Sequence, residues 1–178
     1  MKRTTLTIAA ATLLVATSAL AQSVGEKTGV NSTLGISPTT ADFVKEAAMS
    51  DMTEIAAAEL GKERGHAQEK AFAGQMITDH TKTSEELKSM APVDAKAAIP
   101  AALDSSSQSK IDKLKDAKQD DFSSDFDSMQ VSAHKDAVSL FERYAKGGED
   151  PKLKDWAGET LPALQHHLEM AQNLGKTK

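Results

Sequence analysis

The sequence contains no cysteine. This absence excludes disulfides, thiolate metal ligands, thiol catalysis and a lipid-modified N-terminal cysteine. Aromatic residues make up only 4% of the chain, with one tryptophan and one tyrosine, so stacking surfaces for bases or sugars are not expected. The formal net charge is -5 and no basic cluster stands out. Nucleic acid is therefore not an expected partner.

Sequence motifs of common catalytic sites are also missing. The chain has no Gly-rich phosphate loop, no Gly-x-Ser-x-Gly elbow and no His-Glu-x-x-His zinc motif. The sequence therefore gives no positive indication of an enzyme and predicts no catalytic residue.

The first 21 residues have the pattern of a secretion signal. Lys2 and Arg3 form a basic head before the apolar run 6–20, and the run ends in Ala19-Leu20-Ala21, a small-x-small cleavage pattern. A membrane anchor would need about 18 to 20 continuous apolar residues, and this run is shorter and is interrupted by threonines and a serine. We predict a signal peptide over residues 1–21, cleavage near Ala21, a periplasmic or secreted protein, and no membrane insertion after cleavage.

The segment 22–38 is rich in Ser, Gly, Thr and Asn and has no apolar periodicity. This composition predicts a flexible linker that packs against nothing. The remaining residues, 39–175, are predicted to form one helical domain.

Helical periodicity and helix-capping residues predict four long helices and one short helix. Thr39 with Asp42 starts the first helix and Gly65 ends it, while Asp150-Pro151 starts the last. The long helices are expected at about 39–64, 67–90, 121–146 and 151–174, and the short one at about 105–117. The short turn after the first helix makes the first two antiparallel. The predicted fold is all-α: an antiparallel four-helix bundle, ferritin-like, with an extra short helix between the second and third long helices.

Three histidines occupy positions where bundle packing would normally place apolar residues. Alternating steps of four and three place His167 in line with Leu164 and Ala171, and His80 in line with Met76. His134 falls at the edge of the buried face of the third helix. All three lie near the middle of their helices, so we expect their ring nitrogens to share one buried layer.

Glu54 falls on an inward polar face of the first helix, at a similar level. Three imidazoles and one carboxylate form a plausible ligand set for a single Zn, Cu or Fe ion. The sequence therefore suggests metal ligation by His80, His134, His167 and Glu54. The alternative is that each histidine is a buried hydrogen-bonding residue. Asp51, Asp79 and Asp136 could support the histidines, although we expect ordinary solvated charges there.

Five short segments of the predicted domain form a recognisable set. They are Phe43-Val44-Lys45, Phe72-x-x-x-Met76-x-x-Asp79-His80, Leu103-Asp104, Gln130-x-x-x-His134 and Thr160-Leu161-Pro162-x-Leu164-x-x-His167-Leu168. Together they resemble a known family of uncharacterised exported domains that is grouped with ferritin-like bundles and often described as outer-membrane proteins. The resemblance covers about residues 39–174. It implies a helical-bundle fold, export and an unknown function, with the three histidines as recurring polar positions.

A di-iron oxidase is not predicted, because such sites require Glu-x-x-His pairs on two helices. Ile77 and Leu164 stand where those glutamates would be. The one Glu-x-x-His, from Glu63 to His66, spans a helix end. The sequence leaves three interpretations open: a metal-binding bundle, a structural or stress-response interaction protein of the cell envelope without a metal, and a metal-dependent oxidoreductase.

Overall fold

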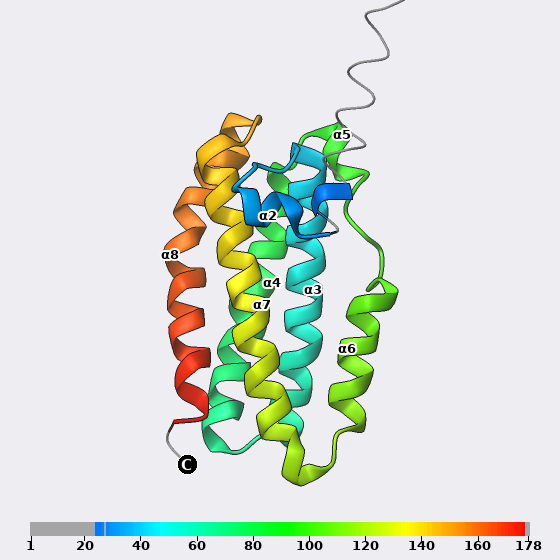
Figure 1. Cartoon of the computed structure of the whole chain (residues 1–178), viewed down its shortest axis with the longest axis vertical. Coiled ribbons are helices and arrows are strands. Elements are labelled where there is room, and N and C mark those ends of the chain that lie inside the picture. The colour runs from blue at the N-terminus through cyan, green and yellow to red at the C-terminus, as the bar shows by residue number, and fades with distance from the viewer. Residues whose placement is uncertain (1–23, 27, 177–178) are drawn as a thin grey trace, which may run out of the picture.

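The computed structural model describes residues 24–26 and 28–176, and all regular structure among them is helical (Figure 1). The prediction of an all-α fold is therefore confirmed. The helices are α2 (Val30–Leu34), α3 (Thr40–Arg64), α4 (Ala67–Met90), α5 (Val93–Lys96), α6 (Ser105–Asp116), α7 (Gln119–Gly147) and α8 (Pro151–Leu174).

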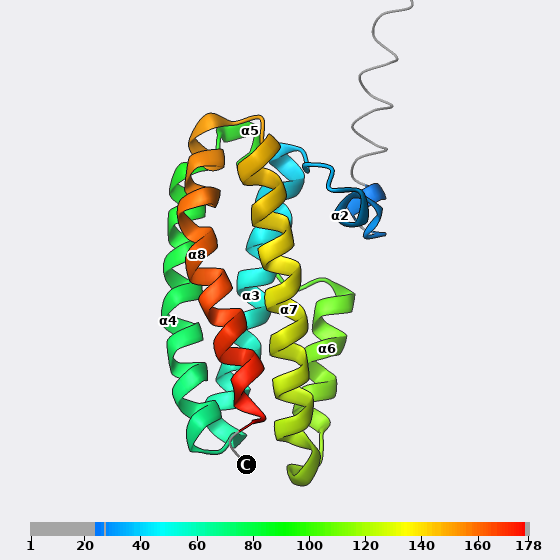
Figure 2. The ribbon, with the colours of Figure 1, turned by 60° about the vertical axis from the view of Figure 1, so that its left-hand side comes forward.

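Four long helices, α3, α4, α7 and α8, lie side by side and form the bundle (Figures 1 and 2). The short α3 to α4 and α7 to α8 turns make each of these two pairs antiparallel. The longer connection from α4 to α7 contains α5 at one end of the bundle and α6 along its outside, beside α3 and α7. The predicted bundle and its extra short helix in this connection are confirmed.

Side-chain caps explain why three of these helices begin where the sequence predicts. The backbone N–H of Asp42 donates to the Thr39 hydroxyl, that of Ser107 to Asp104, and that of Leu153 to Asp150. Each bond satisfies one of the first-turn N–H groups that a helix cannot pair internally. Pro162 lies inside α8 and does not end the helix.

The bundle interior contains two apolar clusters. The first is built around the Phe43 and Tyr144 rings, which stack with centroids 3.9 Å apart. The second is built around Phe72, Phe122 and Phe126, nearer the opposite end of the bundle. Both clusters draw residues from α3, α4, α7 and α8.

Between the two clusters lies a layer of buried polar side chains, which we call the central polar layer. On α8, His167 lies between Leu164 of the first cluster and Ala171 of the second. On α3, the layer falls between Ala48 and Ala57. Since each long helix contributes at least one polar residue, the layer crosses the whole bundle. Its members are Asp51, Glu54, His80, Gln130, His134 and His167.

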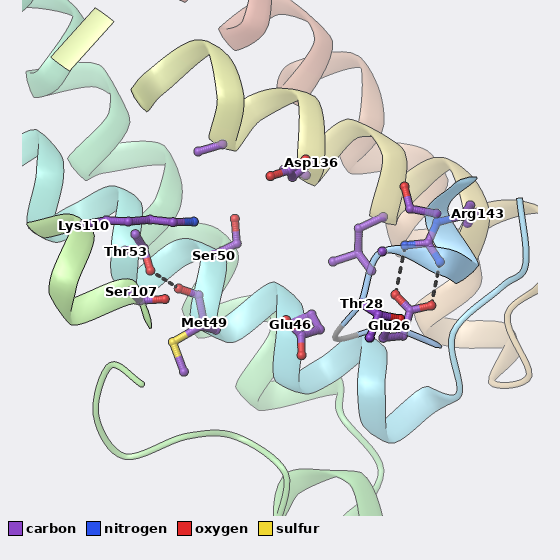
Figure 3. A pocket seen from close by; sticks show the side chains of 15 residues that line it. Glu26, Thr28, Glu46, Met49, Ser50, Thr53, Ser107, Lys110, Asp136 and Arg143 are labelled. Atoms are coloured by element: carbon purple, nitrogen blue, oxygen red, sulfur yellow. Dashed lines mark hydrogen bonds and ion pairs between the residues drawn. The ribbon is translucent and has the colours of Figure 1, made fainter. Parts of the chain in front are cut away.

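The segment before α3 packs against the bundle, so the prediction that residues 22–38 contact nothing is wrong for the part that the structure describes. The Arg143 guanidinium of α7 donates to both carboxylate oxygens of Glu26, at 2.8 and 3.1 Å (Figure 3). It also donates to the Ile36 carbonyl at 2.7 Å. Both charged side chains are largely buried, and Asn31 of α2 is buried as well. We call residues 28–36 together with Glu26 the N-terminal strap. The polar composition of this segment predicted a flexible linker. The sequence could not reveal the contact with the bundle, because a single buried ion pair produces no periodic pattern.

The predicted signal peptide lies outside the described residues. Within residues 24–26 and 28–176, no helix combines the length and apolar character needed to span a membrane.

Candidate metal centre

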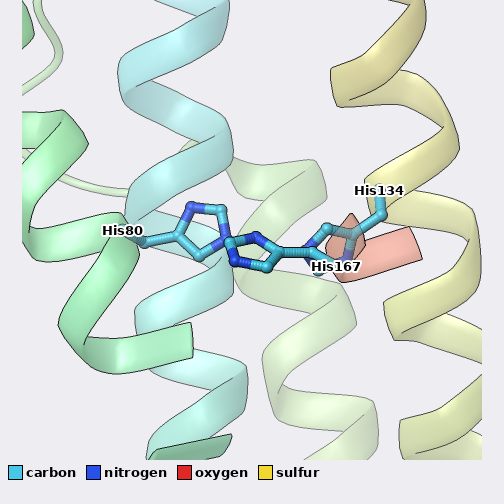
Figure 4. Close-up of side chains that lie close together, drawn as sticks. All are labelled: His80, His134 and His167. Carbon is cyan, nitrogen blue, oxygen red and sulfur yellow. The ribbon is translucent and has the colours of Figure 1, made fainter. Parts of the chain in front are cut away.

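The three histidines come from three different helices and meet in the central polar layer. His80 belongs to α4, His134 to α7 and His167 to α8, and Figure 4 shows their rings turned toward one another. Ring centroids are 5.5 to 5.7 Å apart. Taking one ring nitrogen from each residue, the three nitrogens all lie within 4.8 Å of one another. The prediction that these nitrogens share one buried layer is confirmed, and we call the group the histidine triad.

Each imidazole is held in place by a hydrogen bond from one of its two ring nitrogens. His80 Nδ1 lies 2.8 Å from Oδ1 of Asp51, and His167 Nε2 lies 2.9 Å from Oδ2 of Asp79. His134 Nδ1 lies 2.9 Å from the backbone carbonyl oxygen of Gln130, one turn earlier on α7. Since carboxylates and carbonyls only accept, these three nitrogens donate. The hydrogen bonds thus fix both the ring orientation and the tautomer of each neutral imidazole.

The second nitrogen of each ring is buried and has no hydrogen-bond partner among the described residues. These atoms are His80 Nε2, His134 Nε2 and His167 Nδ1. In the neutral rings, each of these nitrogens presents a lone pair. Leaving a buried polar atom unpaired costs about 1 to 3 kcal/mol, so three in one layer form a costly arrangement unless something binds them. A cation that accepts nitrogen lone pairs fits this donor set.

The environment favours neutral imidazoles at two of the three positions. Burial lowers the pKa of His134 to about 3, although its bond to the Gln130 carbonyl partly opposes the shift. Burial also lowers the pKa of His167, and the hydrogen bond with Asp79 only partly offsets this effect. Burial opposes charge on His80 too, but its hydrogen bond to Asp51 and the nearby carboxylates raise its pKa overall. Among the three imidazoles, His80 is thus the one whose pKa its neighbours raise.

Glu54 lies beside the triad but is not part of the group of converging nitrogens. Its Oε1 is 4.0 Å from Nδ1 of His134, which is the nitrogen already bonded to the Gln130 carbonyl. Burial raises the Glu54 pKa to about 7, and the charge of His80 and the amide of Gln130 partly oppose this shift. Both Glu54 and Gln130 are almost completely buried. A role for Glu54 as a fourth ligand stays a prediction.

Asp51 and Asp79 are more important to the triad than their sequence context indicated. We expected solvated charges, but Asp51 is buried and also accepts hydrogen bonds from Thr83 and Ser84. Asp79, although partly exposed, bonds His167 across the α4 to α8 boundary. The one available signal for Asp51 is its spacing of three from Glu54, which places both on one face of α3. Asp136 is exposed, as expected.

Two histidines outside the triad have other positions. His166 is exposed, with Glu169 at 4.0 Å, in agreement with the solvent side expected of the residue next to His167. His66 is the residue before α4, where its backbone N–H donates to Glu69. The Glu63 to His66 spacing is therefore part of a helix junction. Among the described residues, the histidine triad is the only cluster of three or more His, Asp or Glu side chains whose ligand atoms converge closely enough to hold a metal ion.

Fold and site together define a class: a four-helix bundle with a convergent histidine triad in its core. The chain matches the family described as Domain of unknown function (DUF4142) over residues 25–174. It belongs to that family, so the resemblance to an uncharacterised domain family is confirmed. Searches of curated proteins and of solved structures found no match.

Proposed function

We propose that this protein binds one divalent transition metal ion, Zn, Cu or Fe, through His80, His134 and His167. The observation that carries the proposal is the convergence of three buried ring nitrogens, each on an imidazole whose other nitrogen is already hydrogen-bonded. Metal-binding histidines usually have this arrangement, because a bond to the outer nitrogen directs the inner lone pair at the ion.

The size of the site is compatible with a first-row ion after a small closure. Imidazole nitrogens bind zinc at about 2.0 to 2.1 Å, so tetrahedral geometry places them about 3.3 Å apart. The triad nitrogens lie within 4.8 Å of one another, and modest rotations of the rings would bring them closer. Three histidines leave one coordination position, for which Glu54 or water is the candidate.

We also propose that the protein is exported. Support comes from the basic head, apolar run and Ala19-Leu20-Ala21 pattern at the start of the sequence. The proposed activity is binding, since the chain has no recognised catalytic motif. Metal-dependent oxidation would require further groups that the proposal does not include.

Metal content and thermal melting test the binding proposal directly. Purified residues 22–178 are expected to take up about one equivalent of Zn, Cu or Fe, and to melt at a higher temperature with the ion, because a ligand held only by the folded state adds stability. His80→Ala, His134→Ala and His167→Ala are each expected to abolish this increment. His166→Ala is the matched control, since His166 is an exposed histidine on the same helix as His167, and it should retain both uptake and increment.

The opposing interpretation is a structural or interaction protein of the envelope whose histidines only hydrogen-bond. In that case, the triad variants lower stability by about 1 to 3 kcal/mol through unpaired partners, equally with and without metal. Melting that does not depend on metal, with no ion found by elemental analysis, would reject the metal-binding proposal.

A further inference from the structure

A cavity between α4 and α8 reaches the histidine triad from the surface. Its volume is about 510 Å³, and His80 and His167 both line it. Two further cavities lie along α3, α6 and α7, and neither is lined by a triad histidine. Glu54 and Gln130 are also absent from the α4 to α8 cavity. The α4 to α8 cavity therefore leads to two of the three triad histidines, while the neighbouring carboxylate of Glu54 is outside its lining.

Carboxylates dominate the charged lining of this cavity. The lining contains three carboxylates, Asp79, Glu86 and Glu159, and one lysine, Lys82. The Lys82 ammonium is 3.7 Å from Glu86. The Trp156 indole N–H donates to Glu86 Oε2 at 3.0 Å, which holds that carboxylate against α8. An acidic opening with low-dielectric walls concentrates cations and disfavours anions.

Two buried histidines on the inner wall of the cavity indicate ligand binding independently of the acidic opening. His80 is 2% exposed and His167 is 4% exposed, and each has one ring nitrogen without a hydrogen-bond partner. Asp79 connects the opening to this wall, because it is partly exposed and accepts hydrogen bonds from Gln75 and from His167.

We propose that the α4 to α8 cavity is the route by which a divalent cation from solvent reaches and leaves the histidine triad. This inference rests on the proposed function, and it adds that the ion is exchangeable rather than permanently enclosed. A cation is drawn in by Glu86 and Glu159, passes Asp79, and exchanges its water for the imidazole nitrogens.

Filling the cavity provides the first test. Ala163 of α8 is exposed and lines the cavity, so Ala163→Phe should obstruct it while all three triad histidines are retained. An obstructed route slows uptake and release by the same factor, expected to be at least about tenfold, and leaves the equilibrium affinity unchanged. Zn²⁺ alone is the probe, with uptake and release followed by rapid mixing against a chromophoric chelator. Gln165→Phe is the matched control, because Gln165 is exposed on the same helix and is not part of the lining.

Removing charge from the opening provides the second test. Glu86→Gln combined with Glu159→Gln should lower the Zn²⁺ association rate about three- to tenfold at low ionic strength, and the difference should shrink with added salt. The control pair is Glu85→Gln with Glu169→Gln, which removes two exposed carboxylates from the same helices outside the lining.

The outcomes separate this inference from the binding proposal. If the unaltered protein binds no Zn²⁺, Cu or Fe, the proposed function fails and the access route fails with it. If the unaltered protein binds Zn²⁺ but Ala163→Phe exchanges it as fast as Gln165→Phe does, the access route is wrong while the proposed function stands. The inference is supported if Ala163→Phe slows uptake and release by the same factor and Gln165→Phe slows neither.

Discussion

Asp51 fixes the orientation of His80. Its Oδ1 accepts the His80 Nδ1–H bond at 2.8 Å, while its Oδ2 accepts hydroxyl hydrogen bonds from Thr83 at 3.0 Å and Ser84 at 3.1 Å. The carboxylate belongs to α3, but all three of these donors belong to α4. An ionised carboxylate behind an imidazole makes the opposite ring nitrogen a stronger donor to a metal.

Asp51→Asn is expected to weaken metal binding about 10- to 100-fold, because it removes the negative charge behind His80 and retains the shape of the side chain. The stability of the metal-free protein should fall by no more than about 1 to 2 kcal/mol, since one carbonyl acceptor remains. Competition titration against a chromophoric chelator measures the first quantity and urea unfolding the second. Asp136→Asn, at an exposed aspartate of α7, should change neither, and equal metal affinities for the two variants would contradict the assigned role of Asp51.

His80 and His167 were predictable from sequence because each interrupts an apolar heptad pattern, and His134 because it falls at the edge of the buried face of its helix. Their supporting groups were not. Asp79 is adjacent in sequence to His80 yet bonds His167, and no spacing rule within one helix reveals a contact between two helices. The Gln130 carbonyl is a backbone atom, and sequence patterns do not indicate which carbonyl a side chain will meet.

At the scale of the helices, α3 packs closely against α4 and α7 at Gly61. A Cβ atom at this position would lie 2.7 Å from two ring atoms of Phe126 on α7 and 3.1 Å from the Ala73 Cβ on α4. The first distance is well inside van der Waals contact, and Phe126 is fully buried. Glycine is therefore required here by packing and not by backbone conformation.

Gly61→Ala is expected to lower the free energy of unfolding by about 1 kcal/mol, because overpacking costs about 1 to 3 kcal/mol and outweighs a helix-propensity gain of up to about 1 kcal/mol. Gly74→Ala is the matched control within a helix. No atom lies within 4 Å of its added Cβ. The helix-propensity gain should therefore appear without an overpacking cost, and Gly74→Ala should stabilise the protein. Urea unfolding of both variants distinguishes the two effects, and stabilisation by Gly61→Ala would show that α3 and α7 can separate at little cost.

Helix boundaries were predictable where a side chain caps the helix or a glycine ends it, as at Thr39, Asp104 and Gly65. The short helices α2 and α5 were not predicted, since five and four residues are too few to show a 3.6-residue period. Their structure depends on contacts with the bundle, such as the burial of Asn31 and Ala95, and tertiary contacts of this kind are not encoded locally.

At the scale of the whole molecule, the N-terminal strap is attached to α7 mainly through Arg143. Breaking a buried ion pair costs about 3 to 5 kcal/mol when the remaining charge stays buried. Here the strap is short and lies on the outside of the bundle (Figure 2), so it can lift away and let water reach the guanidinium. The loss in free energy of unfolding should then be no larger than the free energy with which the strap packs against the bundle.

Glu26→Ala is therefore expected to lower the free energy of unfolding by about 1 to 3 kcal/mol, and deletion of residues 22–35 should produce nearly the same loss. Urea unfolding measures both, and hydrogen exchange of the α2 amides should become fast in Glu26→Ala. Thr33→Ala, at an exposed hydroxyl that bonds the Gly29 carbonyl within the strap, is the control and should cost much less. A stable, protected α2 in the Glu26→Ala protein would contradict this account.

The central polar layer also determines the register of the helices. Sliding one helix by a single heptad would shift its side chains by about 10 Å along its neighbours, and the alanines, leucines and phenylalanines of the two apolar clusters could still find apolar partners. The layer tolerates no such slip, because the buried His80 would lose its hydrogen bond to Asp51 and the buried His167 would lose its hydrogen bond to Asp79. A single polar side chain can set helix register in this way in coiled coils. The central polar layer, which contains the histidine triad, therefore specifies one alignment of the four helices, and an entirely apolar interior would not.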